Sequence, residues 1–233
     1  MQSLSQVAIE LPTHLNGSLP LDELARQYLA ALLRADRQAA SQMILQAVEQ
    51  GTSIKEIYLR IFQCSQRELG RLWQTNQISV AQEHFCTAAT QMIMSQLYPY
   101  IFSGERKTHR LVAACVGGEL HEIGARMVAD FFEMQGWDTY FLGANTPPES
   151  IVSTVVERQA EVLALSATMT FHVSKVTGII AALRAGGASP RTRILVGGYP
   201  FNLAPELWVN VGADGYAPDA ETAILEGERM LLA

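Results

Sequence analysis

The sequence predicts a two-part fold: a four-helix bundle at residues 19–103, after an irregular lead-in at 1–18, and a doubly wound, Rossmann-like parallel sheet at 108–233. Three observations support this prediction. Apolar residues recur at helical spacing through the first part. Beyond the polar linker, short apolar runs alternate with amphipathic stretches, as in parallel sheets covered by helices. Several of these runs end in glycine or small polar residues, at the edge where open α/β sheets bind ligands.

Each helix of the first part has a start or stop signal. Pro20 stands near the start of the first helix, and Asp36 is a suitable N-cap for the second. Thr52 or Ser53 can cap the third helix, which ends before a polar segment. Pro99 is expected to bend or end the fourth. Because the connections are short, the four helices are expected to form an antiparallel bundle.

In the second part, strands and helices alternate. Strands are predicted at 110–116, 139–143, 162–167 and 193–198, with a shorter one near 212–217. Helices are predicted between them at 122–135, 148–158 and 173–186, with a last one at 219–232. This alternation predicts parallel strands whose carboxyl ends meet at one edge of the sheet.

The composition disfavours several classes of protein. The 233 residues are 48% hydrophobic and 17% charged, which suits a sizeable core, and the net charge of −6 disfavours a nucleic-acid partner. The sequence lacks both the apolar run of about eighteen residues that a membrane span needs and the pattern of a secretory signal. Cys64, Cys86 and Cys115 lie far apart on apolar stretches, which indicates reduced thiols in a cytoplasmic protein.

The segment Gly118–Gly124 joins the first predicted strand to its helix and carries an acid and an imidazole. Glu119 stands two residues before His121. A carboxylate in this position can fix the orientation of the imidazole and raise its basicity, as a metal-ligating histidine requires. On its own, such a pair is more often a helix-capping acid beside a surface histidine.

Two further motifs follow this segment at fixed distances. Forty-one residues (125–165) separate Gly124 from Ser166-Ala167-Thr168, and twenty-eight residues (169–196) separate Thr168 from Gly197-Gly198. This three-part pattern resembles the cobalamin-binding domain family, which carries Asp-x-His-x-x-Gly, Ser-x-Leu/Thr and Gly-Gly at about these spacings. The resemblance covers residues 108 to 233, and Glu119 departs from the family's usual aspartate.

The resemblance implies a cobalamin site at the carboxyl edge of the sheet. His121 would be the lower cobalt ligand, in place of the cofactor's own dimethylbenzimidazole. The residues implied to bind the cofactor are Glu119, His121, Glu122 and Gly124 in the first loop, Asn145, Thr146 and Pro147 in a loop under the corrin ring, Ser166, Thr168, Gly197 and Gly198 along the slot for the nucleotide tail, and Tyr199 and Gly215 at the ends of later strands.

Simpler interpretations exist for some of these residues. Hydroxyls such as those of Ser166 and Thr168 are as often caps for the next helix, and the loops around Asn145 and Gly215 could be ordinary turns. Glycine at 197 and 198 would let a bulky ligand approach a backbone that Cβ atoms would otherwise screen. His172 follows Thr168 and is a further candidate to line the slot.

The first part has a motif of its own, in which Trp73 is followed after nine residues (74–82) by Glu83-His84. In an isolated bundle, such a tryptophan would be core and the Glu-His pair would face solvent. Ahead of a cobalamin domain, the spacing resembles the Trp-x9-Glu-His motif of the cobalamin-dependent photoreceptors, the CarH-like light sensors. That resemblance implies that the three side chains pack around the 5′-deoxyadenosyl group of adenosylcobalamin.

Two features depart from the light-responsive repressors of this family. Gln74 stands where they have a cobalt-ligating histidine, and no basic helix-turn-helix region precedes the bundle, so direct DNA binding is not expected. The layout is similar to that of the photocobilins, which hold biliverdin beside cobalamin. Aromatic residues that could line a bilin site, or equally belong to the core, are Tyr98, Tyr100, Phe171, Tyr199 and Phe201.

From these resemblances we expect a light sensor that binds adenosylcobalamin base-off, with biliverdin as a candidate second chromophore. Photolysis of the cobalt–carbon bond would change domain packing and the state of a homo-oligomer, and would thereby signal to an unidentified protein partner. The chain itself would not be an enzyme. The alternative is a corrinoid methyl carrier of a methyltransferase system, and a passive cobalamin-responsive regulator would share every motif. A zinc site of His84, Cys86 and His121 is disfavoured because the first two point to different faces of a helix.

Overall fold

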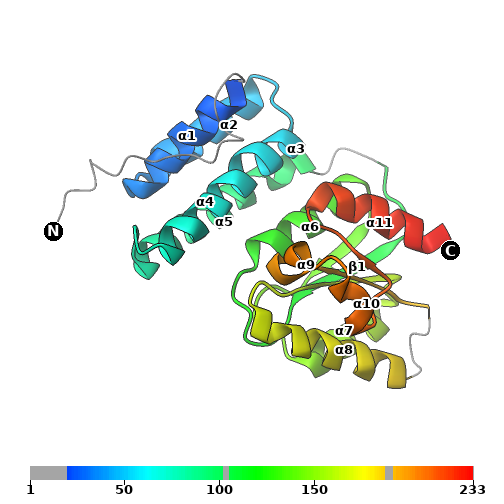
Figure 1. The fold of residues 1–233 in the computed structure, drawn as a ribbon. Helices are drawn as coiled ribbons and strands as arrows, with labels where there is room; N and C mark the ends of the chain where they lie inside the picture. The colour runs from blue at the N-terminus through cyan, green and yellow to red at the C-terminus, as the bar shows by residue number, and fades with distance from the viewer. Residues whose placement is uncertain (1–19, 102–104, 187–190, 233) are drawn as a thin grey trace. The chain divides into compact units, whose positions relative to one another are not determined.

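The computed structural model describes residues 20–101, 105–186 and 191–232, so the predicted lead-in at 1–18 lies outside the described residues. The chain divides into two compact units, residues 1–101 and 102–233, and each is described by itself. The first is helical, and the second is a five-stranded parallel sheet with helices on both faces (Figure 1). This confirms the predicted fold class. None of the helices in the described ranges is both long enough and apolar enough to cross a membrane.

The helical unit follows the predicted start signals closely. Its helices are α1 (Pro20–Leu33), α2 (Arg37–Glu49), a third helix made of α3 (Ile54–Glu56), the π-helical η3 (Ile57–Phe62) and α4 (Gln63–Gln74), and then α5 (Val80–Ile101). Asp36 accepts a hydrogen bond from the N–H of Ala39 (2.9 Å), and Ser53 forms a capping box with Glu56. Pro99 does not end α5, because so near the terminus its missing N–H costs the helix only one bond.

Aromatic rings fill the core of the helical unit. Tyr28 from α1 and Tyr58 from η3 are both buried and lie 5.5 and 5.4 Å, centroid to centroid, from the ring of Phe62. The buried Tyr28 hydroxyl is hydrogen-bonded to Thr90 Oγ1 of α5 at 2.8 Å. Three helices are therefore joined by one apolar cluster with a satisfied polar group inside it.

The sheet unit alternates strands and helices as predicted. Its elements are β1 (Arg110–Cys115), α6 (Ile123–Met134), β2 (Asp138–Phe141), α7 (Pro148–Arg158), β3 (Val162–Ser166), η4 (Thr170–His172), α8 (Val173–Ala185), β4 (Arg193–Gly197), α9 (Tyr199–Leu203), α10 (Leu207–Val211), β5 (Gly215–Tyr216) and α11 (Ala220–Leu232). The strand order is β2-β1-β3-β4-β5, and all pairs are parallel. After β1, the strand β2 is added on one side and β3 on the other, so the boundary between β1 and β3 is the switch point at which such sheets bind ligands.

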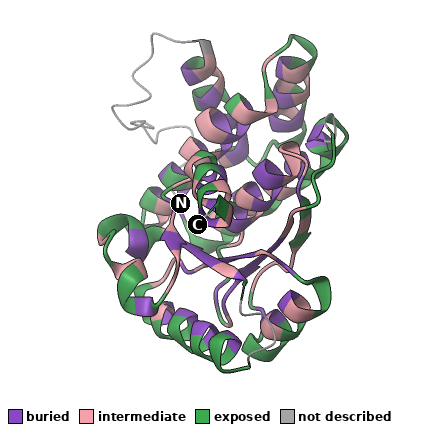
Figure 2. Ribbon diagram, turned by 90° about the vertical axis from the view of Figure 1, so that its right-hand side faces the viewer, coloured by how far each residue is buried: buried purple, intermediate pink, exposed green. Residues whose placement is uncertain are grey.

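Helices cover both faces of the sheet. Helices α6 and α11 pack together on one face, and α7, α8 and α10 pack on the other (Figure 1). The central strands are consequently buried on both sides, as Figure 2 shows. The residues of one of these cores include Val112, Ala114, Ile151, Val155, Leu163, Leu165, Ile179, Ile194, Val196 and Phe201.

The structure differs from the prediction after β4. The segment expected to be a connection contains two short helices, α9 and α10, and the fifth strand is limited to Gly215–Tyr216. Leu207, Trp208 and Val211 pack against the core beneath α8, and Gly212, with φ +81°, ends α10. The sequence signal was too short for a helix to be predicted, because a single turn leaves only two or three apolar positions.

Helix α6 carries an acid whose ionisation opposes folding. Burial, with the charge of Asp130, raises the pKa of Glu133 to about 7, and Arg106 offsets this only partly. Because the folded-state pKa exceeds that of the unfolded chain, the stability from protonated Glu133 is present at low pH and is lost as the pH rises through about 7. We expect Glu133→Gln to stabilise the chain by about 1 kcal/mol at pH 8 and much less at pH 5, in chemical denaturation. An equal gain at both pH values would contradict this.

Candidate functional site

The loop after β1 and the loop after β3 meet at the switch point of the sheet, and the side chain that joins them is Glu119. Its carboxylate is fully buried. One oxygen, Oε1, accepts hydrogen bonds from the backbone N–H (3.1 Å) and Nδ1 (2.5 Å) of His121. The other, Oε2, accepts from the N–H groups of Thr168 (2.7 Å) and Met169 (3.0 Å) and lies 2.9 Å from Nδ1 of His172. A single carboxylate therefore contacts two imidazoles and joins the segment after β1 to the segment after β3.

These contacts fix the ionisation of the carboxyl group. Burial alone would raise the pKa of Glu119, but the hydrogen bonds from His121, His172 and the backbone outweigh it and hold the pKa well below its usual range. An ionised carboxylate can only accept, so both imidazoles donate Nδ1–H to it. In His121, Nε2 then lies on the side of the ring away from Glu119, and the side chain is 45% exposed. This is the arrangement in which a histidine ligates a metal through Nε2.

The loop after β2 contacts the segment Gly118–Gly124, here called the histidine loop, on the side away from the loop after β3. Asn145, in the left-handed region at φ +50°, accepts a hydrogen bond from the N–H of Gly118 (2.6 Å) and donates its own N–H to the Glu119 carbonyl (2.8 Å). Glu122 accepts from the N–H of Ala144 at 2.8 Å. Asn145 and Glu122 thus position the loop rather than forming an ordinary turn. Of their neighbours, Thr146 is buried and bridges to Val116, while Pro147 precedes α7 and is exposed.

The two glycines at the end of β4, Gly197 and Gly198, have a structural reason that the sequence did not reveal. Gly198 has φ +110°, and a Cβ there would overlap the carbonyl oxygen of Ala167. A Cβ on Gly197 would lie 3.1 Å from the carbonyl oxygen of Ala217. Approach of backbone to backbone, not of a ligand, is therefore enough to require glycine at 198. The slot role of both residues stays a prediction.

The remaining predicted residues of the sheet unit lie at the same edge or close to it. Ser166 is the last residue of β3, and neither it nor Thr168 caps a helix, because η4 and α8 start without a side-chain cap. Gly124 is in the first turn of α6 and faces open space. Gly215 is buried in β5, where a Cβ would meet Met230. Large apolar side chains are exposed in the segments that follow β1, β3 and β4: Leu120, Phe171 in η4 and Tyr199 in α9.

Trp73, Glu83 and His84 belong to the helical unit. Trp73 lies in the last turn of α4 and is half-buried, and Glu83 and His84 lie in the first turn of α5. Glu83 accepts a hydrogen bond from Thr87 (2.7 Å), and its other oxygen is 3.7 Å from Nε2 of the 67% exposed His84. Thr87 is in turn bonded to Gln66 at 3.2 Å. Glu83 is therefore anchored to the third helix of its own unit.

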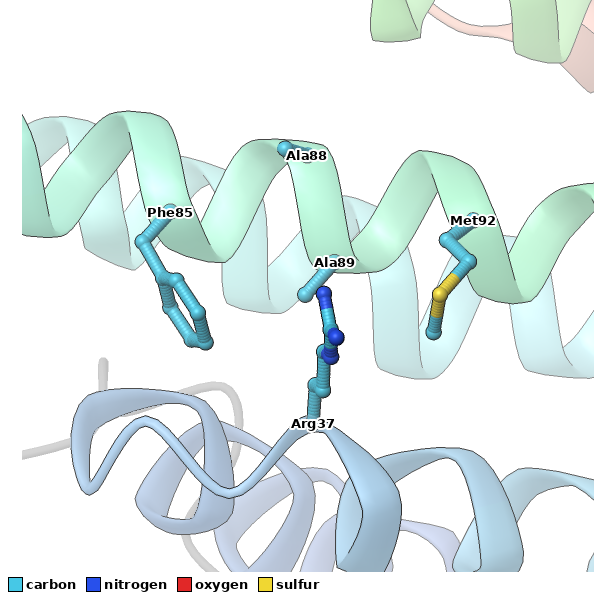
Figure 3. Close-up of a pocket in the computed structure, with 5 residues that line it drawn as sticks. All are labelled: Arg37, Phe85, Ala88, Ala89 and Met92. Carbon is cyan, nitrogen blue, oxygen red and sulfur yellow. The ribbon is translucent and has the colours of Figure 1, made fainter.

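Other possible sites in the described residues are weaker. A pocket of about 110 Å³ between α2 and α5 is lined by Arg37, Phe85, Ala88, Ala89 and Met92, and contains no predicted site residue (Figure 3). Across the ranges that the structure describes, no three His, Cys, Asp or Glu side chains gather as metal ligands would. Burial raises the pKa of the Cys86 and Cys115 thiols to about 12, so neither is a reactive thiolate.

The structure gives His172 a contact that the sequence did not reveal. Its ring is buried and lies 2.9 Å, through Nδ1, from Oε2 of Glu119, whereas the sequence suggested only a place along the nucleotide slot, which stays a prediction. The available signal was its position just after β3, because residues at adjacent strand ends lie at the same edge. A buried carboxylate also needs several donors, and the sequence offered only His121.

Comparison with known proteins decides the family. The B12 binding domain model matches residues 109–225, half of the chain, and a second model, also described as a B12 binding domain, matches residues 24–98. The chain belongs to the B12-binding domain family. The cobalamin-binding domain that three short motifs predicted is thereby supported, and each of the two units matches a model described as a B12 binding domain.

Several curated relatives are corrinoid proteins. Dimethylamine corrinoid protein 3 of Methanosarcina acetivorans is 29% identical over 129 residues, which are 55% of this chain and 59% of the relative. Dimethylamine corrinoid protein 2 of the same organism is 30% identical over 54% of this chain and 58% of its own length. The chain thus aligns with less than two thirds of each. Dimethylamine corrinoid protein 1 is 25% identical over 90% of this chain and 98% of its own length.

A solved structure has the same fold. The monomethylamine corrinoid protein of Methanosarcina barkeri superposes with a TM-score of 0.79 over 91% of this chain and 99% of its own, at 18% identity. This similarity agrees with the predicted fold, in which a helical unit is followed along the chain by a parallel-sheet unit.

The light-sensor prediction is wrong. A curated relative that aligns over both units is named dimethylamine corrinoid protein 1, and dimethylamine corrinoid proteins 2 and 3 match as well, which favours the corrinoid methyl carrier over the light sensor. The prediction depended on Trp73 and the Glu83-His84 pair, whose spacing is also compatible with a contact inside the helical unit, where Glu83 binds Thr87. That the chain is not itself an enzyme agrees with the relatives, which are named corrinoid proteins and not methyltransferases.

Proposed function

We propose that this chain is a cobalamin-binding methyl carrier that works with a partner methyltransferase on methylated amines. The observation that carries the proposal is the pair of Glu119 and His121 at the switch point of the sheet. Nδ1 of His121 is 2.5 Å from a buried carboxylate oxygen, so Nε2 is oriented to ligate cobalt. The names of the relatives, dimethylamine corrinoid proteins, support methylated amines as the substrate class.

The residues at the sheet edge fit a corrinoid. A neutral imidazole nitrogen is a suitable ligand for cobalt, and the exposed Leu120, Phe171 and Tyr199 offer apolar surface to a large flat macrocycle. The bound cobalt supplies the chemistry of accepting and releasing a methyl group. The protein's part is to hold His121 in one tautomer through Glu119, and to fix the loop through Asn145 and Glu122.

Adenosylcobalamin and biliverdin were expected only because of the light-sensor interpretation, so neither is proposed as a cofactor here. A homo-oligomer, a cytoplasmic location and the two-domain boundaries stay predictions. The partner proposed here is the methyltransferase that loads the carrier.

The test is methyl transfer in a reconstituted system. The chain is loaded with cobalamin, reduced, and mixed with ¹⁴C-labelled mono-, di- or trimethylamine and the matching methyltransferase. The expected result is radiolabel that travels with the carrier on gel filtration and is absent when His121→Ala replaces the wild type. A chain that binds cobalamin through His121 but acquires no label from any of the three amines would contradict the carrier function.

A further inference from the structure

The buried ring of His172 shares one carboxylate with His121. Its Nδ1 lies 2.9 Å from Glu119 Oε2, on the oxygen that does not face His121. Its side chain is about as buried as the carboxylate itself, with 6% and 0% exposed. Oε2 already accepts the N–H groups of Thr168 and Met169, so it is an acceptor here, the contact with His172 is a donated N–H, and Glu119 receives a hydrogen bond from each of two imidazoles.

The surroundings of His172 hold its ring in this position. Phe171 packs edge-on against it, with ring centroids 4.4 Å apart. On the other side, Nε2 of His172 lies 3.2 Å, and Nζ of Lys175 2.9 Å, from the position that a Cβ on Gly118 would take. Lys175 also donates to the carbonyl of Gly117 at 2.5 Å. The glycine at 118, with φ +83°, therefore leaves room for the His172 ring and the Lys175 ammonium group.

The remaining hydrogen bonds determine what the loss of His172 would do. Oε2 also accepts from the N–H groups of Thr168 and Met169, so two backbone donors would still orient the carboxylate without the imidazole. What would change is the negative charge available to Oε1, because a carboxylate that receives fewer hydrogen bonds is a stronger acceptor at those that remain. His121, bonded to Oε1 at 2.5 Å, would then be the more basic imidazole.

We propose that His172 is a positioning residue that acts on the metal-ligating histidine through Glu119, by drawing part of the carboxylate's charge away from His121. It makes His121 a weaker donor to cobalt than a histidine that had the carboxylate to itself. A weaker lower ligand would suit a carrier whose cobalt both accepts and releases a methyl group. This inference rests on the proposed function for its purpose, but the contact between the three side chains does not depend on a bound cofactor.

Two variants separate charge sharing from simple packing. His172→Leu places an apolar side chain of similar bulk at this position and removes the hydrogen-bond donor. His172→Asn places an amide N–H close to the position of Nδ1 and keeps the donor. Both are compared with the wild type only after thermal unfolding and amide spectra show that the fold is retained. If His172→Leu unfolds, His172→Asn and His172→Gln form the comparison, because the glutamine amide reaches the position of Nε2 and not of Nδ1.

The first readout uses the protein without cobalamin. ¹⁵N-resolved NMR of the histidine rings observes the Nδ1 proton that His121 donates to Glu119. We expect this proton to move downfield in His172→Leu, or in the glutamine variant, and to stay at the wild-type position in His172→Asn. Identical shifts in all variants, or a shift in the asparagine variant equal to that of leucine, would overturn the proposal.

The second readout is the midpoint potential of the bound cobalt, measured by spectroelectrochemistry. A stronger lower ligand stabilises the more oxidised metal, so His172→Leu is expected to have the more negative potential and His172→Asn to match the wild type. A more positive potential in His172→Leu would overturn the proposal. Failure to bind cobalamin would count against the proposed function alone, because the NMR result is obtained without the cofactor.

Discussion

Replacing His121 with alanine is expected to weaken cobalamin binding by roughly 100-fold, because residues one shell behind a metal ligand already change affinity by about 10–100-fold. We expect this large effect because the His121 ring contacts a fully buried carboxylate on one side and is itself half-exposed. The substitution removes the imidazole but leaves Glu119 with its bonds to Thr168, Met169 and His172. The loop should therefore keep its conformation. Titration of the purified protein with cobalamin, followed by absorption, measures the affinity.

A second histidine in the same unit is the matched control. His109 lies just before β1, at the opposite edge of the sheet, and its Nδ1 is 3.1 Å from a carboxylate oxygen of Glu161. Like His121, it is a histidine whose Nδ1 contacts a glutamate, but it lies away from the switch point. His109→Ala should leave cobalamin affinity within about twofold of the wild type, in the range of a substitution away from the site. Equal losses in both variants would contradict the assignment of His121.

Gly198→Ala is expected to destabilise the sheet unit by about 3 kcal/mol or more. The glycine has φ +110° and ψ 173°, a region that is almost restricted to glycine, and the added Cβ would overlap the Ala167 carbonyl. Relief would require β4 and the loop after β3 to separate, and that loop carries the donors of Glu119. Denaturant unfolding of the two proteins measures the loss.

The control for this glycine is Gly178, in the middle of α8. A Cβ there meets nothing within 4 Å, and the backbone is helical. Gly178→Ala should accordingly stabilise the chain by up to about 1 kcal/mol, because alanine is the better helix former. If both substitutions had the same effect, the backbone conformation at 198 would not be the cause.

Much of the fold was accessible from the sequence because local signals agreed with the global pattern. Asp36 and Ser53 cap the helices that they were expected to start, and the alternation of apolar runs and helices predicted the parallel sheet. The placement of the histidine loop at the carboxyl edge followed from the same alternation. The order of the strands did not, since periodicity does not say which strands are neighbours.

The candidate site was only partly predictable for the same reason. Glu119 and His121 are two residues apart, so their contact follows from spacing, whereas the contact of Glu119 with His172 spans 53 residues and depends on β1 and β3 being adjacent. The sequence suggested that a ligand approaches Gly198, whereas the group that approaches it in the structure is the Ala167 carbonyl. The ligand contact that the spacing of Trp73 and Glu83 suggested stays a prediction, and the partner that the structure gives Glu83 is Thr87 of its own helix.

The most direct test of the central claim is electron paramagnetic resonance of the protein loaded with cob(II)alamin, prepared once with ¹⁴N- and once with ¹⁵N-labelled histidine. If a histidine of the chain is the lower ligand, the cobalt lines split into triplets with ¹⁴N and into doublets with ¹⁵N, and the splitting by ¹⁵N is absent in His121→Ala. Triplets in both preparations would show that the cofactor's own base remains on cobalt. That result would contradict a cobalamin held through His121.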